Sequence, residues 1–142
     1  MALCELARLA GIRREWQQSA ALFGEALVLH REAGHQLGMV ECIEGLGGLV
    51  LEWGMAEQAT RLIAAATAWR ETTGATLPPP DREAVDRTAA AARAVLGAAG
   101  LRTLREASTS VSLDQAIDIA LHIAGAARET SEGDALDQTA GG

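Results

Sequence analysis

The 142-residue chain contains no lysine and no tyrosine, and aromatic residues make up only 3% of it. Without lysine, a phosphate-binding loop of the Gly-x-x-x-x-Gly-Lys-Ser/Thr type cannot be present. With so few aromatic rings, alanine and leucine must fill most of the core. No run of 18 or more apolar residues indicates a membrane span, and no basic segment followed by a long apolar stretch indicates a signal peptide. We therefore expect a cytoplasmic protein.

The charged residues are strongly biased, because all 12 basic residues are arginine and the formal net charge is −7. Nucleic-acid-binding domains usually carry a basic stripe or a high pI, so we expect no direct contact with nucleic acid. Alanine and arginine are strong helix formers, which favours an all-α fold. Cys4 and Cys42 lie in helical patterns, and a disulfide is unexpected in an intracellular protein. We interpret them as small buried thiols.

Apolar residues at spacings of three or four predict about seven helices. Gly34 and Gly74 are placed to end two of them, and Pro78-Pro79-Pro80 predicts an extended spacer. Ser112 and Gln115 match a capping box at the start of the last helix. The expected helices cover residues 2–12, 15–33, 36–53, 56–73, 81–96, 101–107 and 113–127, with a loop at 108–110. Residues 129–142 are polar and aperiodic, which predicts a disordered tail.

Two stretches of the chain match each other at a spacing of 40 residues. Trp16, Ser19, Phe23, Ala26 and Gly34 recur as Ala56, Ala59, Ile63, Ala66 and Gly74. Such a period is typical of helical repeats, which bury their apolar faces by stacking. In the second unit, Gly47 and the triplet Ala59, Ile63 and Ala66 match the tetratricopeptide (TPR) pattern. In the first unit, Arg14 stands where the turn glycine is expected.

We therefore expect antiparallel helix pairs stacked as a short TPR-like α-solenoid over residues 1–128. Its repeats would cover about 1–35 and 36–75, followed by atypical helices at 81–127. A plain antiparallel helical bundle is the alternative.

A longer set of motifs between residues 38 and 121 carries a family resemblance. The matching residues are Glu41-Cys42, Glu44, Leu46, Ala59, Arg61-Leu62, Ala65-Ala66, Arg70, Gly74, Pro79 or Pro80, Arg93, Leu96-Gly97, Ser112-Leu113, Ala116 and Ala120-Leu121. Together they resemble the C-terminal region of bacterial LuxR-type and AfsR-type (maltose-regulator-like) signal-transduction ATPase regulators. Such regulators carry an NTPase module followed by TPR-like repeats. The resemblance implies the repeat domain of a transcriptional or signalling regulator, without its catalytic and DNA-reading parts.

The repeat register also places a set of residues on a concave groove. In repeats of this type the first helix of each pair lines that groove, with Cys4 and Arg8 as its first-repeat members. The second-repeat members are Glu41, Glu44, Gly48, Leu51 and Glu52. An acidic groove around one apolar patch favours a basic or amphipathic helix from a protein partner. We expect a non-catalytic interaction or regulatory module. A small-molecule effector-sensing domain is the alternative, and a deep apolar pocket would favour it.

The first helix presents Leu3, Leu6 and Leu9 with no capping repeat before it. Solenoids need polar terminal caps for solubility. We expect either missing N-terminal repeats or a homodimer that forms through this N-terminal edge.

Potential catalytic and metal-binding residues form no recognisable motif. His30, His35, Glu41 and Cys42 have a spacing that fits no standard zinc motif. Paired carboxylates such as those of Asp114 and Asp118 can serve acid–base chemistry, but here they fit a solvated helix face. The sequence therefore predicts no enzyme activity and no catalytic, cofactor-binding or metal-binding residue.

Overall fold

The computed structural model describes residues 2–100, 102, 106 and 111–140, and over these residues every element is an α-helix, as the sequence predicts. The helices are α1 (Ala2–Ile12), α2 (Trp16–Ala33), α3 (Gln36–Glu52), α4 (Ala56–Thr73), α5 (Pro79–Leu96) and α7 (Leu113–Ala140). The short helix expected at 101–107 and the loop expected at 108–110 lie largely outside the described residues. Within the described part of the chain, no helix combines the length and apolar character that crossing a bilayer requires.

The helix ends follow local sequence signals. Gly34 and Gly74 end α2 and α4 with φ angles of 74° and 75°, in the left-handed region that glycine enters without steric cost. The turns within the two hairpins also have equivalent geometry. Gly54 follows α3 with a φ of 94°, and Arg14 follows α1 with a φ of 61°. Arg14 therefore takes the left-handed conformation of the turn glycine whose place it occupies.

Local sequence signals also explain where α5 and α7 begin. The predicted capping box is confirmed, since the Ser112 backbone N–H donates to Gln115 Oε1 at 2.8 Å and the Gln115 N–H donates to Ser112 Oγ at 3.2 Å. Helix α5 begins at Pro79, two residues before the expected start. Proline is well suited to the first helical turn, where its missing N–H has no intrahelical partner to lose.

Helix α7 is longer than the sequence analysis predicts. It continues to Ala140, through residues 129–140 that were expected to be disordered, while residues 141–142 lie outside the description. This segment contains no proline, and its single glycine, Gly133, costs only about 1 kcal/mol in a helix interior. Polarity and lost apolar periodicity therefore do not end a helix in the absence of a helix-breaking residue.

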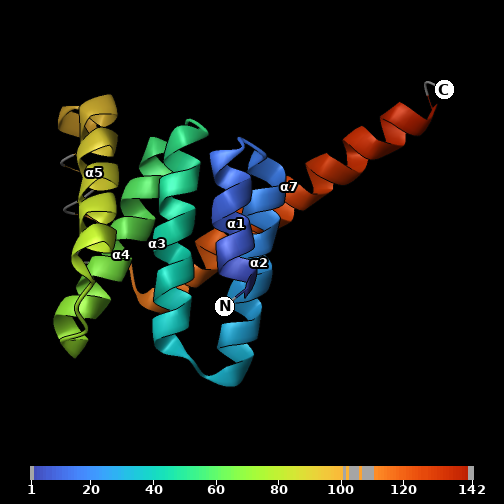
Figure 1. Cartoon of the computed structure of the whole chain (residues 1–142). Coiled ribbons are helices and arrows are strands. Elements are labelled where there is room, and N and C mark those ends of the chain that lie inside the picture. Colours follow the sequence, from blue (N-terminus) through green and yellow to red (C-terminus); the bar gives the residue numbers. More distant parts are fainter. Residues whose placement is uncertain (1, 101, 103–105, 107–110, 141–142) are drawn as a thin grey trace.

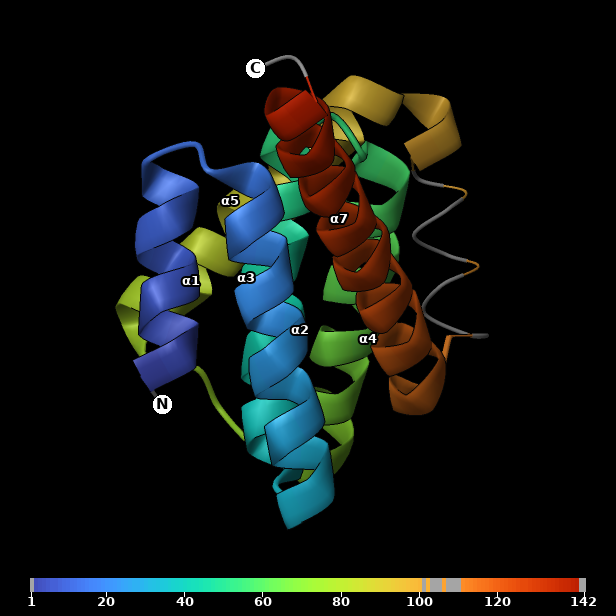
Figure 2. The ribbon, with the colours of Figure 1, turned by 90° about the vertical axis from the view of Figure 1, so that its right-hand side faces the viewer.

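The helices are arranged as consecutive hairpins with one long helix across them. Helix α1 packs against α2, α3 against both α2 and α4, and α5 against α3 and α4. Helix α7 crosses this set and contacts α2, α4 and α3 (Figures 1 and 2). Helix α3 is therefore in contact with every other described helix.

The core lies between these helices and is built mainly from alanine and leucine-sized side chains. Its largest fully buried members are Leu27, Val40, Ile43, Leu46, Val50 and Leu62. Helix α7 approaches α2 very closely at Gly24, where an added Cβ would collide with the Cβ of Ala124. Small residues on both helices therefore set the separation of α2 and α7.

We predict that Gly24→Ala lowers the free energy of unfolding by about 1–3 kcal/mol, because the new methyl group must push α7 away. Gly125→Ala is the matched control. It makes the same chemical change on α7, where an added Cβ meets nothing within 4 Å. The control should be neutral or stabilise by up to about 1 kcal/mol. Urea unfolding monitored by circular dichroism measures both, and equal effects would contradict the close approach.

Candidate functional site

An open groove runs along α3, with α1 and α5 as its walls. It consists of two adjoining cavities of about 620 Å³ and 1010 Å³. Both cavities are lined by Arg8, Gly45, Gly48, Ala84 and Thr88, so they are continuous with each other. We call this feature the α3 groove.

The residues that line the α3 groove follow the 40-residue period. Arg8 of α1, Gly48 of α3 and Thr88 of α5 all line it at this spacing. Gly11, Leu51 and Ala91 do the same one helical turn further along. The period detected between the first two helix pairs therefore extends into α5.

The structure places all five groove residues that the sequence analysis named along this surface. Glu41, Glu44 and Gly48 line the smaller cavity, and Gly48, Leu51 and Glu52 line the larger one. Cys4 is not among the lining residues and instead meets Cys42. The sequence analysis missed the α5 side of the groove, including Asp81, Thr88 and Arg87. Adding 40 to the numbers of Glu41 and Gly48 would have found the first two.

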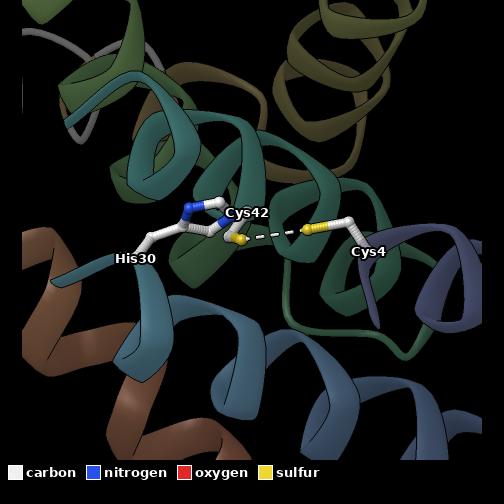
Figure 3. A group of neighbouring side chains, drawn as sticks. All are labelled: Cys4, His30 and Cys42. Atoms are coloured by element: carbon white, nitrogen blue, oxygen red, sulfur yellow. Dashed lines mark hydrogen bonds between the residues drawn. The ribbon is translucent and has the colours of Figure 1, made fainter. Parts of the chain in front are cut away.

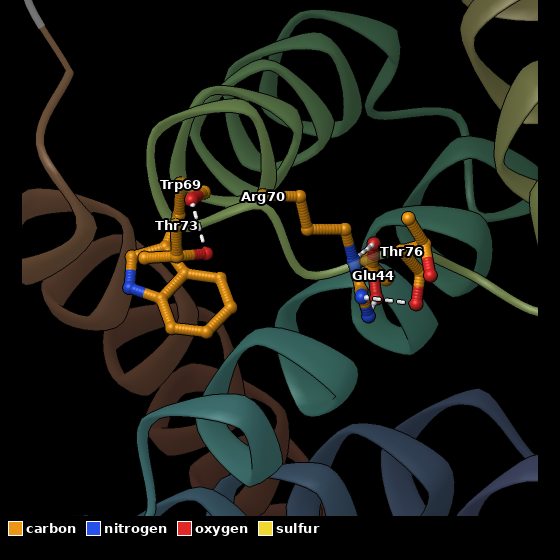
Figure 4. A network of polar contacts seen from close by, with 5 residues as sticks. All are labelled: Glu44, Trp69, Arg70, Thr73 and Thr76. Atoms are coloured by element: carbon orange, nitrogen blue, oxygen red, sulfur yellow. Dashed lines mark hydrogen bonds and ion pairs between the residues drawn. The ribbon is translucent and has the colours of Figure 1, made fainter.

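Glu44 differs from the other acidic groove residues because its charge is already paired. Its carboxylate accepts two hydrogen bonds from Arg70 of α4, from Nε to Oε2 and from Nη2 to Oε1, each at 2.8 Å (Figure 4). Arg70 Nη1 also donates to the Thr76 carbonyl oxygen at 3.3 Å. The two paired side chains are only 7% and 9% exposed. The hydrogen bonds with Glu44 raise the pKa of Arg70, so the guanidinium remains charged.

This pair changes the expected charge of the groove. With Glu44 and Arg70 neutralising each other, the smaller cavity keeps the carboxylates of Glu41 and Asp81. The larger cavity keeps Glu52 together with Arg14 and Arg87. Arg8 lies where the cavities meet. The groove is therefore acidic at one end and basic at the other, which corrects the expectation of a groove that is acidic around one apolar patch.

The proposed N-terminal edge is partly exposed. Leu6 and Leu9 are each 51% exposed and Leu3 is half-buried, while Ala7 and Ala10 form the buried face of α1. Ile12 adds a further apolar side chain, 78% exposed, that the sequence analysis did not include. Ala10 is buried in the core, so it does not share a face with Leu6 and Leu9.

Three helices bring together a cluster that the sequence analysis did not predict. Its members are Cys4 of α1, His30 of α2 and Cys42 of α3 (Figure 3). The two Sγ atoms and one imidazole nitrogen all lie within 4.8 Å of one another. The two sulfur atoms are 3.3 Å apart and share a hydrogen bond. Cys42 is buried, and Cys4 and His30 are half-buried. His35 and Glu41, which were considered with His30 and Cys42 from sequence, are not part of this cluster.

The shared hydrogen bond separates the acidities of the two thiols. It lowers the pKa of Cys4 to about 6; burial raises this pKa, and His30 offsets part of that increase. The same bond, together with burial, raises the pKa of Cys42. A single proton held between the sulfurs accounts for both directions.

The sequence analysis considered His30 and Cys42 together but not with Cys4. The repeat register placed Cys4 and Cys42 on the first helices of neighbouring pairs, but it did not indicate which side chains would face each other. The partner from α2, His30, has no counterpart in that register.

Comparisons of the chain with protein-family models, with curated proteins and with solved structures find no match.

We predict that Arg70→Met lowers the free energy of unfolding by about 3–5 kcal/mol, because it leaves the Glu44 carboxylate buried without a partner. The double variant Glu44→Leu/Arg70→Met should recover most of that loss, since both charges are then absent. Urea unfolding of the two single variants and the double variant forms a complete cycle. Simple additivity of the two single effects would show that the carboxylate and guanidinium do not depend on each other.

Proposed function

We propose that this chain is a non-catalytic, cytoplasmic protein-interaction module whose α3 groove binds an amphipathic helix of a protein partner. We further propose that it acts as the repeat domain of a transcriptional or signalling regulator. The observation that carries the proposal is the groove itself, which is continuous, open and lined by equivalent positions of the alternate helices α1, α3 and α5.

The dimensions of the groove suit a helix. The 17 residues of α3 extend for about 25 Å, which matches a partner helix of about 15 residues. Gly48 lies on the floor and presents no side chain, and an added Cβ there would meet only Thr88 Oγ1, so a partner helix can approach α3 closely at this point. Leu37, Leu51 and Val85 add apolar surface along its length. Recognition of an amphipathic helix in a groove depends on this combination of close approach and apolar anchors.

The charges of the groove define the partner further. Glu41 and Asp81 at one end favour basic side chains, and Arg14 and Arg87 at the other end favour acidic ones. We therefore propose a charge-polarised amphipathic helix. Charge complementarity of this kind gives specificity and orientation more than affinity.

The alternative function is the sensing of a small-molecule effector. The smaller cavity, of about 620 Å³, lies within the size range of ligand pockets and favours this alternative. Two features weigh against it. The cavity opens into the larger one, and its most buried polar groups, Glu44 and Arg70, already satisfy each other. An extended partner accounts for the whole groove.

The family resemblance supports the regulatory part of the proposal. Glu44 and Arg70 both belong to the motif that resembles the C-terminal region of LuxR-type and AfsR-type regulators, and in this chain they form a buried ion pair. That part of the motif therefore has a structural role. The exposed groove carboxylates of Glu41, Glu52 and Asp81 are the ones free to contact a partner.

The groove is tested with designed helical peptides of about 15 residues that share a leucine face. One peptide carries arginines at one end and glutamates at the other, one carries only arginines and one only glutamates. We predict that the polarised peptide binds most tightly by fluorescence anisotropy. Tightest binding of the all-arginine peptide would show that the groove behaves as uniformly acidic, and no binding of any peptide would contradict the proposed function.

Filling the groove should abolish this binding without unfolding the protein. An added Cβ at Gly48 meets only Thr88 Oγ1, at 3.6 Å, so the side chain of a Gly48→Leu variant starts without a backbone clash and extends into the groove. We predict at least about tenfold weaker binding of the polarised peptide, because the leucine occupies the floor of the groove. Gly125→Leu, on the exposed face of α7, is the matched control and should leave binding unchanged.

We also propose that the N-terminal edge (Leu3, Leu6 and Leu9, with Ile12) associates with the same edge of a second copy. The half-exposed leucines on one helix support this proposal, because apolar side chains gathered on a surface mark interaction sites.

We predict that light scattering after size-exclusion chromatography detects a concentration-dependent dimer that Leu6→Glu disrupts. Because Leu6 is half-exposed, the variant should keep its helicity and its stability within about 0.5 kcal/mol. Val95→Glu, at an exposed position of α5, is the control and should remain dimeric. A wild-type monomer at high micromolar concentration would contradict self-association through this edge.

A further inference from the structure

We propose that Cys4, His30 and Cys42 form a binding site for one Zn²⁺ ion, a property separate from the groove and from the proposed function. Two sulfurs and one imidazole nitrogen from three different helices converge within 4.8 Å (Figure 3). Thiolate and imidazole are the ligands that Zn²⁺ prefers, and three protein ligands leave a fourth position for water. The proposal reverses the sequence-based expectation of no metal site.

The distances in the cluster need only a small adjustment to hold the ion. A Zn²⁺ ion about 2.3 Å from each sulfur keeps the two sulfurs about 3.8 Å apart. The sulfurs of Cys4 and Cys42 are 3.3 Å apart, so they must separate by about half an ångström. On binding, each sulfur that carries a proton loses it to solvent and forms a bond to the ion. Two thiolates then balance the charge of Zn²⁺.

The surroundings of the cluster position the imidazole as a ligand. Gly38 lies on α3 directly beside the His30 ring, and a Cβ at that position would collide with ring atoms, including Nδ1. The missing side chain at residue 38 therefore makes the space in which His30 lies next to Cys42. Cys4 is half-buried, so the cluster is not sealed from solvent on the α1 side.

Two neighbouring thiols can also form a disulfide, but disulfide chemistry does not explain why the His30 imidazole lies beside them. Disulfide formation needs an external oxidant to accept two electrons, and it makes no use of an imidazole. Metal binding uses all three groups and needs no redox partner. It would also tie α1 to α2 and α3 at a point where α1 otherwise contacts α3 only lightly.

The test is titration of the fully reduced, oxygen-free protein with Co²⁺, whose thiolate complexes absorb in the near ultraviolet and visible regions. We expect thiolate-to-cobalt charge-transfer bands that saturate at one ion per chain and disappear when one equivalent of Zn²⁺ is added. Cys4→Ser and Cys42→Ser should each remove most of the charge-transfer intensity. Circular dichroism of each variant checks that it is folded.

Two further variants separate a built site from nonspecific thiol binding. Gly38→Ala keeps both cysteines but displaces the His30 ring, and we expect Zn²⁺ affinity to fall about tenfold or more. His35→Ala is the matched control. The centroid of the His35 ring lies 6.0 Å from that of the His30 ring, yet His35 is not part of the cluster. This variant should therefore leave the Zn²⁺ affinity unchanged. Absence of charge-transfer bands in the reduced wild-type protein would overturn the proposal. Equal Zn²⁺ affinity in wild type and Gly38→Ala would overturn the role of His30.

Discussion

Helix α3 is in contact with every other described helix, and the rest of the structure depends on how closely those neighbours can approach it. The glycines of α3 make this close approach possible. An added Cβ at Gly45 would lie 2.6 Å from the Phe23 ring of α2, and one at Gly47 would lie 2.9 Å from Ile63 of α4. Each glycine costs about 1 kcal/mol in a helix interior, so α3 is a weak helix by itself. Its conformation is maintained by tertiary packing, which those same glycines make possible.

The candidate sites are different uses of the same helix. On its open side, Gly48 leaves the floor of the groove bare, while Gly38 leaves room for an imidazole beside Cys42. Glu44 would place a carboxylate between packed helices, and the bidentate contact with Arg70 is what makes that position tolerable. Removal of side-chain volume and neutralisation of one charge thus give α3 both its central position and its accessible surface.

Local features of this chain could be predicted from sequence, and pairings between helices could not. Gly34, Gly74 and the Ser112–Gln115 capping box act within one helical turn, so their residue types alone identify the helix ends. The groove positions on α3 followed from the repeat period. The Glu44–Arg70 and Cys4–Cys42 pairs join separate helices, and nothing in either residue's local sequence identifies its partner. The continuation of α7 to Ala140 was missed because polarity was read as disorder.

The position of α7 has a consequence for how the chain folds. Contacts such as Gly24 with Ala124 join segments 100 residues apart in the sequence, whereas the hairpins from α1 to α5 form between immediate neighbours. Closing a long loop costs more conformational entropy than closing a short one, and such contacts form slowly. The hairpins can therefore assemble first, with the α2 surface exposed until α7 arrives. During synthesis this surface stays uncovered until α7 has been made, well after α2.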